Sequence, residues 1–359
     1  MIALKNCRWE RSGEVLTLMA DQSRTIELDD PTGDVAALLA ALREGAEDAA
    51  ALTARLRASG HDTDVATVRT AIEALDGLRV LERSETSIDR RPRKHRDYSN
   101  LAYFDLFSSL DVTAEDFRSR LADAHVVQLG VGGLGSNVLQ SLCGLGVGRL
   151  TLLDNDLVEP ANFARQFVYR EDQVGTPKVE RAAQWARAFS SDIDVRTVSR
   201  WVGGPDDVSD LLTDADLVVS GVDQPNDIDL WVNEACVTAG VPWIRGGMFG
   251  TMVIYFSVDP GRTACYRCSR AASDRGVVRR LSSGLDRVNR GIGPAAALVG
   301  SLVAFEALRY LTGFAPPYAA GASVILDTAD GCRQTRTEWA RDPGCPACAR
   351  TPRAMAGAS

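Results

Sequence analysis

A glycine-rich turn between an apolar segment and a helical pattern constrains the fold of this chain more than any other feature. Gly130, Gly132 and Gly135 have the spacing G-x-G-x-x-G, and Gly133 lies inside it. The turn follows the apolar segment HVVQL and precedes SNVLQSLCGLG. This order of strand, turn and helix is typical of nucleotide-binding α/β folds, whose backbone N–H groups and helix N-termini bind phosphate. The alternative is a tight turn without a ligand.

Two acidic residues follow at the end of the next apolar segment, LTLLDND. Asp154 lies 24 residues after Gly130, which is the spacing expected of an acceptor for ribose hydroxyls. Asp156 is a second candidate for contact with the nucleotide. The alternative for Asp154 is a turn residue that stabilises the strand end locally.

A polar cluster then lies within NFARQFVYREDQVGTPK. Arg165 offers a planar fork to phosphate and Lys178 offers a point charge, while Asn162 and Gln166 can form hydrogen bonds nearby. The alternative is that both are solvated surface cations, which is the usual interpretation of a single lysine on a helix. Together, just after an acidic strand end, they favour an enzyme that cleaves ATP between the α- and β-phosphates over a dehydrogenase.

Asp223 lies in SGVDQPND, directly after the apolar segment DLVVSG. Ligands of open α/β sheets bind at the carboxyl ends of the strands, and a carboxylate there can hold Mg²⁺ on phosphate oxygens. The sequence therefore predicts a magnesium ligand at Asp223. The alternative is an N-cap, in which Asp223 or Asn226 serves the helix of DIDLWVNEAC.

Strand and helix patterns alternate from residue 125 onward. We predict a Rossmann-like, doubly wound and mostly parallel α/β sheet, in an ATP-binding domain over residues 101–350. Strands are expected near DVRTV and DLVVSG, and a long helix at PAAALVGSLVAFEALRYLTG. Residues 351–359 are expected to form a flexible tail.

Residues 1–85 predict a separate, winged-helix-like α+β domain. EVLTLM, TIEL and LRVLER have strand patterns, and helical patterns lie at Val35–Leu42, Leu52–Leu56 and Val68–Leu75. Domains of this kind often present a sheet edge or a helix groove to a peptide. Residues 86–100, TSIDRRPRKHRDYSN, are expected to be a basic linker.

The net charge is −8, which argues against nucleic-acid binding. The N-terminus lacks the apolar core of a signal peptide, and the longest uncharged apolar stretch, 293–305, is too short to span a bilayer. We therefore expect a cytoplasmic protein without a membrane partner. Paired cysteines in such a compartment indicate a metal site before disulfides.

Two C-x-x-C pairs, Cys265 with Cys268 and Cys345 with Cys348, supply four thiolates. Four thiolates suit tetrahedral Zn²⁺ with no open position, which is a structural site. The alternative is four unlinked thiols. Cys143 and Cys236 lie on apolar helix faces and are expected in the core.

These motifs together resemble the ubiquitin-activating-type (ThiF/MoeB-like) adenylyltransferase superfamily over residues 96–350, and within it the peptide adenylyltransferases of the microcin C type. The resemblance implies ATP and Mg²⁺ as cofactors, a homodimer, and a zinc site of the kind just described. It also implies a ribosomal precursor peptide as partner, with its leader bound by the N-terminal domain and a carboxylate adenylated. Two alternatives are a non-catalytic leader-binding partner of another enzyme and a sulfur-carrier-protein adenylyltransferase.

The resemblance also implies an arginine that reaches the partner subunit's ATP, from a segment of the form R-Y-x-R. Here the segment reads Arg96-Asp97-Tyr98-Ser99, with serine at the second arginine position. Arg96 is the candidate for this arginine, and Arg93 is the alternative. Residues 166–235 contain no cysteine, so we expect adenylation without an obligatory enzyme thioester.

Overall fold

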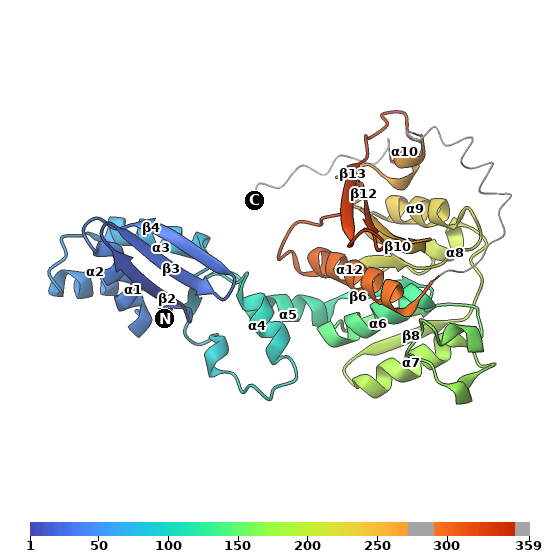
Figure 1. Cartoon of the computed structure of the whole chain (residues 1–359), viewed down its shortest axis with the longest axis horizontal. Coiled ribbons are helices and arrows are strands. Elements are labelled where there is room, and N and C mark those ends of the chain that lie inside the picture. The colour runs from blue at the N-terminus through green and yellow to red at the C-terminus, as the bar shows by residue number, and fades with distance from the viewer. Residues whose placement is uncertain (272–290, 349–359) are drawn as a thin grey trace. The chain divides into compact units, whose positions relative to one another are not determined.

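The computed structural model describes residues 1–271 and 291–348, so the expected tail lies outside the described residues. The chain forms two compact units, Met1–Ser119 and Arg120–Ser359 (Figure 1). Each unit is described separately below.

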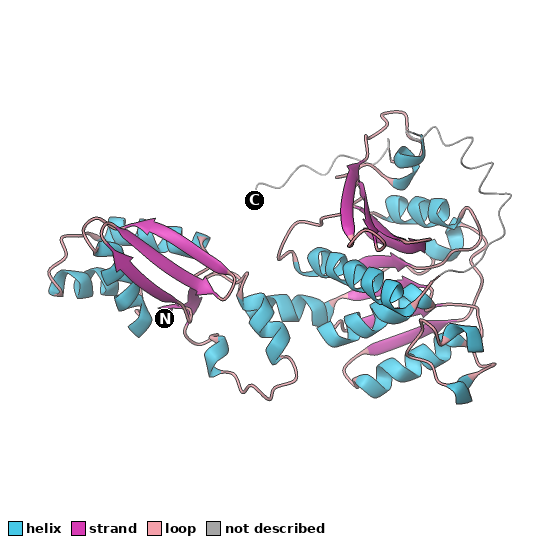
Figure 2. Ribbon diagram, viewed as in Figure 1, coloured by secondary structure: helices cyan, strands magenta, loops and turns pink. Residues whose placement is uncertain are grey.

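Residues 1–83 of the first unit combine two small antiparallel sheets with helices (Figure 2). One sheet has the order β2 (Arg8–Ser12), β3 (Val15–Asp21), β4 (Arg24–Asp29), and the other pairs β1 (Ile2–Leu4) with β5 (Leu81–Arg83). The helices are α1 (Asp34–Glu44), α2 (Ala49–Ala58) and α3 (Val65–Gly77). The winged-helix-like α+β pattern is confirmed. β1 and β2 were not predicted, because RWERS in β2 has no buried apolar alternation.

Buried and exposed side chains alternate along β3, and the buried ones pack in the core of this unit. Leu16 and Leu18 are fully buried and pack with helical leucines such as Leu39. Two of the helices have an aspartate N-cap. Asp48 of α2 accepts a hydrogen bond from Ala51 N at 2.8 Å, and Asp64 caps α3 in the same way. An N-cap of this kind stabilises a helix by about 1 kcal/mol.

Hydrogen bonds to its backbone fix the segment after β5 to the rest of the first unit. It contains η1 (Ile88–Arg90), α4 (Tyr98–Asp105) and α5 (Ala114–Asp123). The side chain of Lys5 donates to Ser108 O at 3.1 Å, and Arg83 Nε donates to Leu110 O at 2.8 Å. The two compact units therefore divide within α5 rather than within residues 86–100. The functional domain limits drawn from the sequence stay predictions.

Glu82 in β5 makes the stability of this unit depend on pH. The pKa of Glu82 is raised to about 7, mainly by burial and also by nearby Asp105, while Ser87 and Lys5 oppose the shift. An unfolded glutamate has a pKa of about 4.3, so the folded state keeps a proton that the unfolded state loses. Stability contributed by this site therefore falls as the pH rises from about 4.3 to 7.

The substitution Glu82→Gln is expected to remove that dependence. In urea denaturation of the full chain, the variant should gain stability relative to wild type between pH 5 and pH 8. Glu73→Gln, at an exposed position of α3, is the control. An equal difference between Glu82→Gln and wild type at both pH values would contradict the assignment.

The second unit is built on one eight-stranded sheet of order β13-β12-β11-β10-β9-β6-β7-β8. Its strands are β6 (His125–Leu129), β7 (Arg149–Leu153), β8 (Asp194–Val198), β9 (Leu217–Ser220), β10 (Trp243–Phe249), β11 (Met252–Val258), β12 (Ala322–Asp327) and β13 (Arg333–Glu338). The pairs from β8 to β10 are parallel, and those from β10 to β13 are antiparallel. The Rossmann-like, mostly parallel sheet is confirmed, while its antiparallel extension was not predicted.

Helices cover both faces of this sheet. They are α6 (Gly133–Leu145), α7 (Lys178–Phe189), α8 (Pro205–Ser209), α9 (Ile228–Ala239), α10 (Tyr266–Ala271) and α12 (Gly293–Thr312). Trp243 of β10 packs in one core with α9 and the four paired cysteines. Gly246 lies three residues after Trp243 in β10 and therefore on the opposite face of the sheet. There it faces Leu134 of α6 and Val303 of α12. Figure 1 shows α6 and α12 lying side by side.

Within residues 1–271 and 291–348, α12 is the one helix long and apolar enough to cross a membrane by length and composition. It runs to Thr312 and so continues beyond the uncharged stretch 293–305, through Glu306 and Arg309. Half of its most apolar window is buried in the protein. The absence of a membrane partner stays a prediction.

Candidate active site

The candidate site lies where the strand order reverses, at the carboxyl ends of β6 and β9. These two strands are neighbours, and the turns that follow them touch: Gly221 N donates to Leu129 O at 2.8 Å. A Cβ on Gly130 would lie 3.1 Å from Val222 Cγ1, and the φ of Gly130 is 90°. Glycine is therefore required there on two grounds. Ligands of open α/β sheets bind at this kind of switch point.

The other glycines bring the backbone of the turn close to its surroundings. A Cβ on Gly135 would lie 2.0 Å from Gly130 O, so no other residue fits. Gly132 is the N-cap residue of α6 and has no side chain to cap the helix. The first N–H groups of α6 thus face the turn without a side-chain cap, which suits a bound phosphate.

Asp154 braces this turn from the end of β7. Its Oδ2 accepts a hydrogen bond from Val131 N at 2.8 Å, and its Oδ1 accepts one from Asp156 N at 2.8 Å. Burial raises the pKa of the Asp154 carboxyl, although both hydrogen bonds oppose the shift. Tyr169 completes the brace, because its hydroxyl donates to Val131 O at 2.7 Å. The ribose contact expected of Asp154 stays a prediction beside this local role.

The polar cluster of residues 160–166 packs against the glycine turn. It begins with η2 (Pro160–Asn162), where Asn162 is buried and its Oδ1 accepts from Glu159 N at 3.0 Å. The Arg165 side chain lies across the start of α6, where a Cβ on Gly133 would be 3.2 Å from its Cδ. Its Nη1 donates to Ala161 O at 3.1 Å. Asn162 thus shapes the segment, and Arg165 lies beside the turn.

Gln166 is the member of this cluster whose surroundings most favour a bound ligand. Its side chain is 2% exposed and lies near Gly132, with Nε2 3.8 Å from where a Cβ on Gly132 would be. Its Oε1 has no hydrogen-bond partner among the residues that the structure describes. A buried acceptor without a partner is costly, and a bound ligand would remove that cost.

Lys178 begins α7 and is nearly buried. Its Nζ lies 2.8 Å from Asp156 Oδ2, and its backbone N donates to Asp156 O at 2.9 Å. The side chain of Lys178 is 6% exposed, whereas that of Asp156 is 58% exposed. The sequence alternative, a solvated surface cation, is therefore wrong for Lys178.

Asp223 lies in the turn after β9, and its side chain is 82% exposed. The N-cap position of α9 is Asp227, so the capping role considered for Asp223 or Asn226 is wrong. Asp223 Oδ1 accepts a hydrogen bond from Arg245 Nη2 at 2.8 Å. Arg245 was missed in the sequence, although a charged residue in the otherwise apolar strand WIRGG was the available indication.

Arg96 belongs to the first unit and is exposed just before α4. Its expected role in an ATP site of the second unit stays a prediction.

The four paired cysteines come together as the sequence predicted. All four are buried, and their sulfur atoms lie within 4.8 Å of one another. The separations are 3.9 Å for Cys265 and Cys268, 3.6 Å for Cys265 and Cys345, and 3.5 Å for Cys268 and Cys348. These distances exclude disulfides. They match the roughly 3.8 Å between sulfurs of a tetrahedral Zn²⁺ site with 2.3 Å bonds.

Further contacts order this cluster of cysteines. Asp342 N donates to Cys268 Sγ at 3.5 Å, and Asn233 Oδ1 of α9 accepts from Tyr266 N at 2.9 Å. The cluster thus fits a metal ion that would join the segment after β13 to α10. Cys143 and Cys236 are buried in the core, as predicted.

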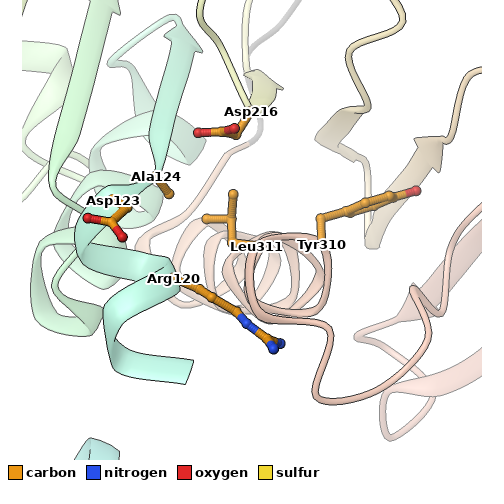
Figure 3. A pocket seen from close by; sticks show the side chains of 6 residues that line it. All are labelled: Arg120, Asp123, Ala124, Asp216, Tyr310 and Leu311. Atoms are coloured by element: carbon orange, nitrogen blue, oxygen red, sulfur yellow. The ribbon is translucent and has the colours of Figure 1, made fainter. Parts of the chain in front are cut away.

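An open cavity of about 390 Å³ lies elsewhere in the second unit (Figure 3). It is lined by Arg120, Asp123, Ala124, Asp216, Tyr310 and Leu311. These residues precede β6 and β9 or end α12, so the cavity lies at the amino ends of the strands. The predicted nucleotide residues do not line it. The chemistry of the turns after β6, β7 and β9 therefore defines the candidate site better than the cavity does.

A family model described as the ThiF family matches residues 106–347. The chain belongs to the ThiF family. The molybdopterin-synthase adenylyltransferase of Salmonella typhimurium is 32% identical over 233 residues, which cover 64% of this chain and 88% of that protein. This ThiF-family chain is accordingly an ATP-dependent adenylyltransferase, and the resemblance found in the sequence is confirmed.

Solved structures extend the likeness of this ThiF-family chain to both units. The crystal structure of E. coli MccB with ATP has a TM-score of 0.77 at 20% identity and covers 97% of this chain and 99% of that chain. The Microcin C7 biosynthetic enzyme MccB in complex with N-formylated MccA has a TM-score of 0.76, with the same identity and coverage. At this identity the likeness establishes the fold.

Proposed function

We propose that this adenylyltransferase activates a carboxylate of a ribosomally made precursor peptide during maturation of a natural product. The observation that carries the proposal is the extent of the fold likeness. It covers 97% of the chain and so includes the first unit, whereas the match to molybdopterin-synthase adenylyltransferase covers 64%. The similar protein MccB is described in complex with N-formylated MccA.

In the proposed reaction a carboxylate oxygen attacks the α-phosphorus of ATP. The bond from that phosphorus to the bridging oxygen breaks, and pyrophosphate leaves with the electron pair. A carboxylate is already ionised at neutral pH, so no general base is needed. Catalysis then depends on alignment and on stabilisation of charge at the phosphates.

The residues around the switch point suit these tasks. The turn from Gly130 to Gly135 and the start of α6 would bind phosphate, with Asp154 near the ribose. Arg165 and Lys178 would stabilise developing negative charge. Asp223 supplies an exposed carboxylate of the type that Mg²⁺ prefers. Bound Mg²⁺ would neutralise phosphate charge.

The first unit offers a surface for the leader of the peptide. Its sheet has the order β2-β3-β4, so β2 and β4 are edges to which an extended peptide can add. β3 also exposes apolar side chains, with Val15 39% and Met19 52% exposed. Such a surface selects a peptide by backbone hydrogen bonds and a few side-chain contacts.

We further propose a cytoplasmic homodimer. On α12, Leu298, Leu302 and Phe305 follow the spacing i, i+4, i+7, and Phe305 is 46% exposed. The resemblance implies a second copy of the chain as partner, and we propose that it packs against this face. In a dimer Arg96 is the candidate to complete the ATP site of the partner.

A second candidate function is adenylation of a sulfur-carrier protein. The names of relatives by sequence favour it, since a molybdopterin-synthase adenylyltransferase is 32% identical to this chain. That function requires the same nucleotide residues and gives no role to the first unit. A non-catalytic leader-binding partner would not need Lys178 and Asp223.

The test is to incubate the full chain with MgATP and the short peptide encoded beside its gene, and then to weigh the products. We expect pyrophosphate release that depends on the peptide, with a peptide mass raised by an adenylate or lowered by water. Pyrophosphate release with a sulfur-carrier protein and none with the peptide would support the second candidate. No reaction with either would support a binding role.

A further inference from the structure

Arg245 is a nearly buried cation beside the candidate magnesium ligand. It lies in β10, paired with Ser220 of β9 on one side and Phe256 of β11 on the other. Its side chain is 13% exposed. A buried guanidinium persists only where charges and hydrogen bonds compensate for lost water, so its partners indicate its role.

Most of the N–H donors of Arg245 form hydrogen bonds to acceptors within the protein. Nε donates to Asp229 Oδ1 at 2.8 Å, and Nη2 donates to Asp223 Oδ1 at 2.8 Å. Nη1 donates to Gly246 O and lies 3.5 Å from Ser220 O. A guanidinium has five N–H donors, so four are directed at protein acceptors. Arg245 is thus committed to the protein rather than to a substrate.

The two carboxylates that Arg245 joins differ in their surroundings. Asp229 belongs to α9 and is 22% exposed, whereas Asp223 lies outside regular structure and is 82% exposed. Burial lowers the pKa of Arg245, but both carboxylates outweigh that effect and raise it. Asp229 and Gly246 therefore fix the guanidinium, and the guanidinium fixes Asp223.

Asp223 is held by one oxygen only. The residues that the structure describes make no hydrogen bond to Oδ2 of Asp223, while Oδ1 is bound to Arg245. An exposed side chain would otherwise lose rotamer freedom on binding an ion. A carboxylate held through one oxygen presents the other to Mg²⁺ at a smaller entropic cost.

We infer that Arg245 is a positioning residue that holds Asp223 in place for Mg²⁺ during adenylation. The inference rests on the proposed magnesium role of Asp223. It does not require contact between Arg245 and ATP or peptide. Groups that orient a metal ligand typically change metal affinity or activity by about 10–100-fold when they are removed.

The test measures pyrophosphate release by the full chain across a Mg²⁺ titration at saturating ATP, with melting temperature as the measure of folding. Arg245→Gln is expected to raise the Mg²⁺ concentration for half-maximal rate about 10-fold or more. Arg245→Lys should give little rescue, because one ammonium cannot bridge both carboxylates. Arg196→Gln, an exposed arginine in β8, should behave as wild type.

A double-variant cycle separates this inference from the proposed function. Asp223→Asn should lower the maximal rate by about 10²–10³-fold. In that background Arg245→Gln should have no further effect, because it acts through Asp223. An unchanged Mg²⁺ titration in Arg245→Gln, or an equal loss in both backgrounds, would overturn the inference. Near-normal turnover in Asp223→Asn would instead overturn the magnesium assignment.

If Arg245→Gln does not fold, Asp229→Ala supplies the same test. It keeps the guanidinium but removes the carboxylate that fixes it, so the Mg²⁺ titration should shift in the same direction. An unshifted titration in a folded Asp229→Ala variant would count against the inference.

Discussion

Replacing Lys178 with methionine is expected to lower the rate of pyrophosphate release by about 10²–10³-fold, the loss typical of one preorganised charge stabiliser. The side chain of Lys178 is 6% exposed, and its Nζ lies 2.8 Å from Asp156 Oδ2. The charge therefore acts in a water-poor environment, where its interaction with phosphate is stronger than in bulk water. Methionine preserves most of the volume and removes the charge. The initial rate of pyrophosphate release at saturating MgATP and peptide is the measurement.

Arg196→Met is the matched control, because it removes an exposed cation from β8, away from the glycine turn. It should retain the wild-type rate. Both variants should bind the peptide as tightly as wild type. A Lys178→Met variant that is folded and turns over within a few-fold of wild type would contradict the role assigned to Lys178.

The second large effect is on stability. Cys345→Ser is expected to lower the free energy of unfolding by about 3–5 kcal/mol, comparable to the loss of a native cross-link in a small domain. The four sulfurs lie within 4.8 Å of one another and join the segment after β13 to α10. Zn²⁺ bound there would act as a cross-link between segments 80 residues apart. Urea denaturation of the metal-loaded protein measures the effect.

Cys332→Ser is the control for this variant, because Cys332 is exposed in the turn between β12 and β13. It should leave both stability and metal content unchanged. Wild type should release one equivalent of Zn²⁺ to a chromophoric chelator under denaturing conditions. A wild-type protein purified without metal, with the stability of Cys345→Ser unchanged, would contradict the structural-zinc proposal.

Local patterns were enough to predict the architecture around the nucleotide turn. Gly130, Gly132 and Gly135 imply a tight strand-to-helix turn because only glycine fits the close backbone contacts there. The structure has this turn, in which a Cβ added to Gly135 would lie 2.0 Å from Gly130 O. The cysteine pairs were equally informative, since C-x-x-C spacing brings two sulfurs together in a single turn.

Contacts across the sheet could not be predicted in this way. The bond from Arg245 to Asp223 joins residues 22 apart on two elements, and it depends on β10 lying beside β9. The strands from β10 to β13 were missed because their position follows from the tertiary pairing of distant segments. The hydrogen bond from Val131 N to Asp154 likewise depends on the register of β6 and β7.

The measurement that tests the central proposal most directly is transfer of ¹⁸O from a peptide whose activated carboxylate is labelled. Attack of that carboxylate on the α-phosphorus places a carboxylate oxygen between carbon and phosphorus. When the adenylate is then captured at carbon, that oxygen leaves with AMP. We expect the nucleotide product to carry one ¹⁸O, with one pyrophosphate released per event. Unlabelled AMP, or ADP and phosphate as products, would contradict adenylation of the peptide carboxylate.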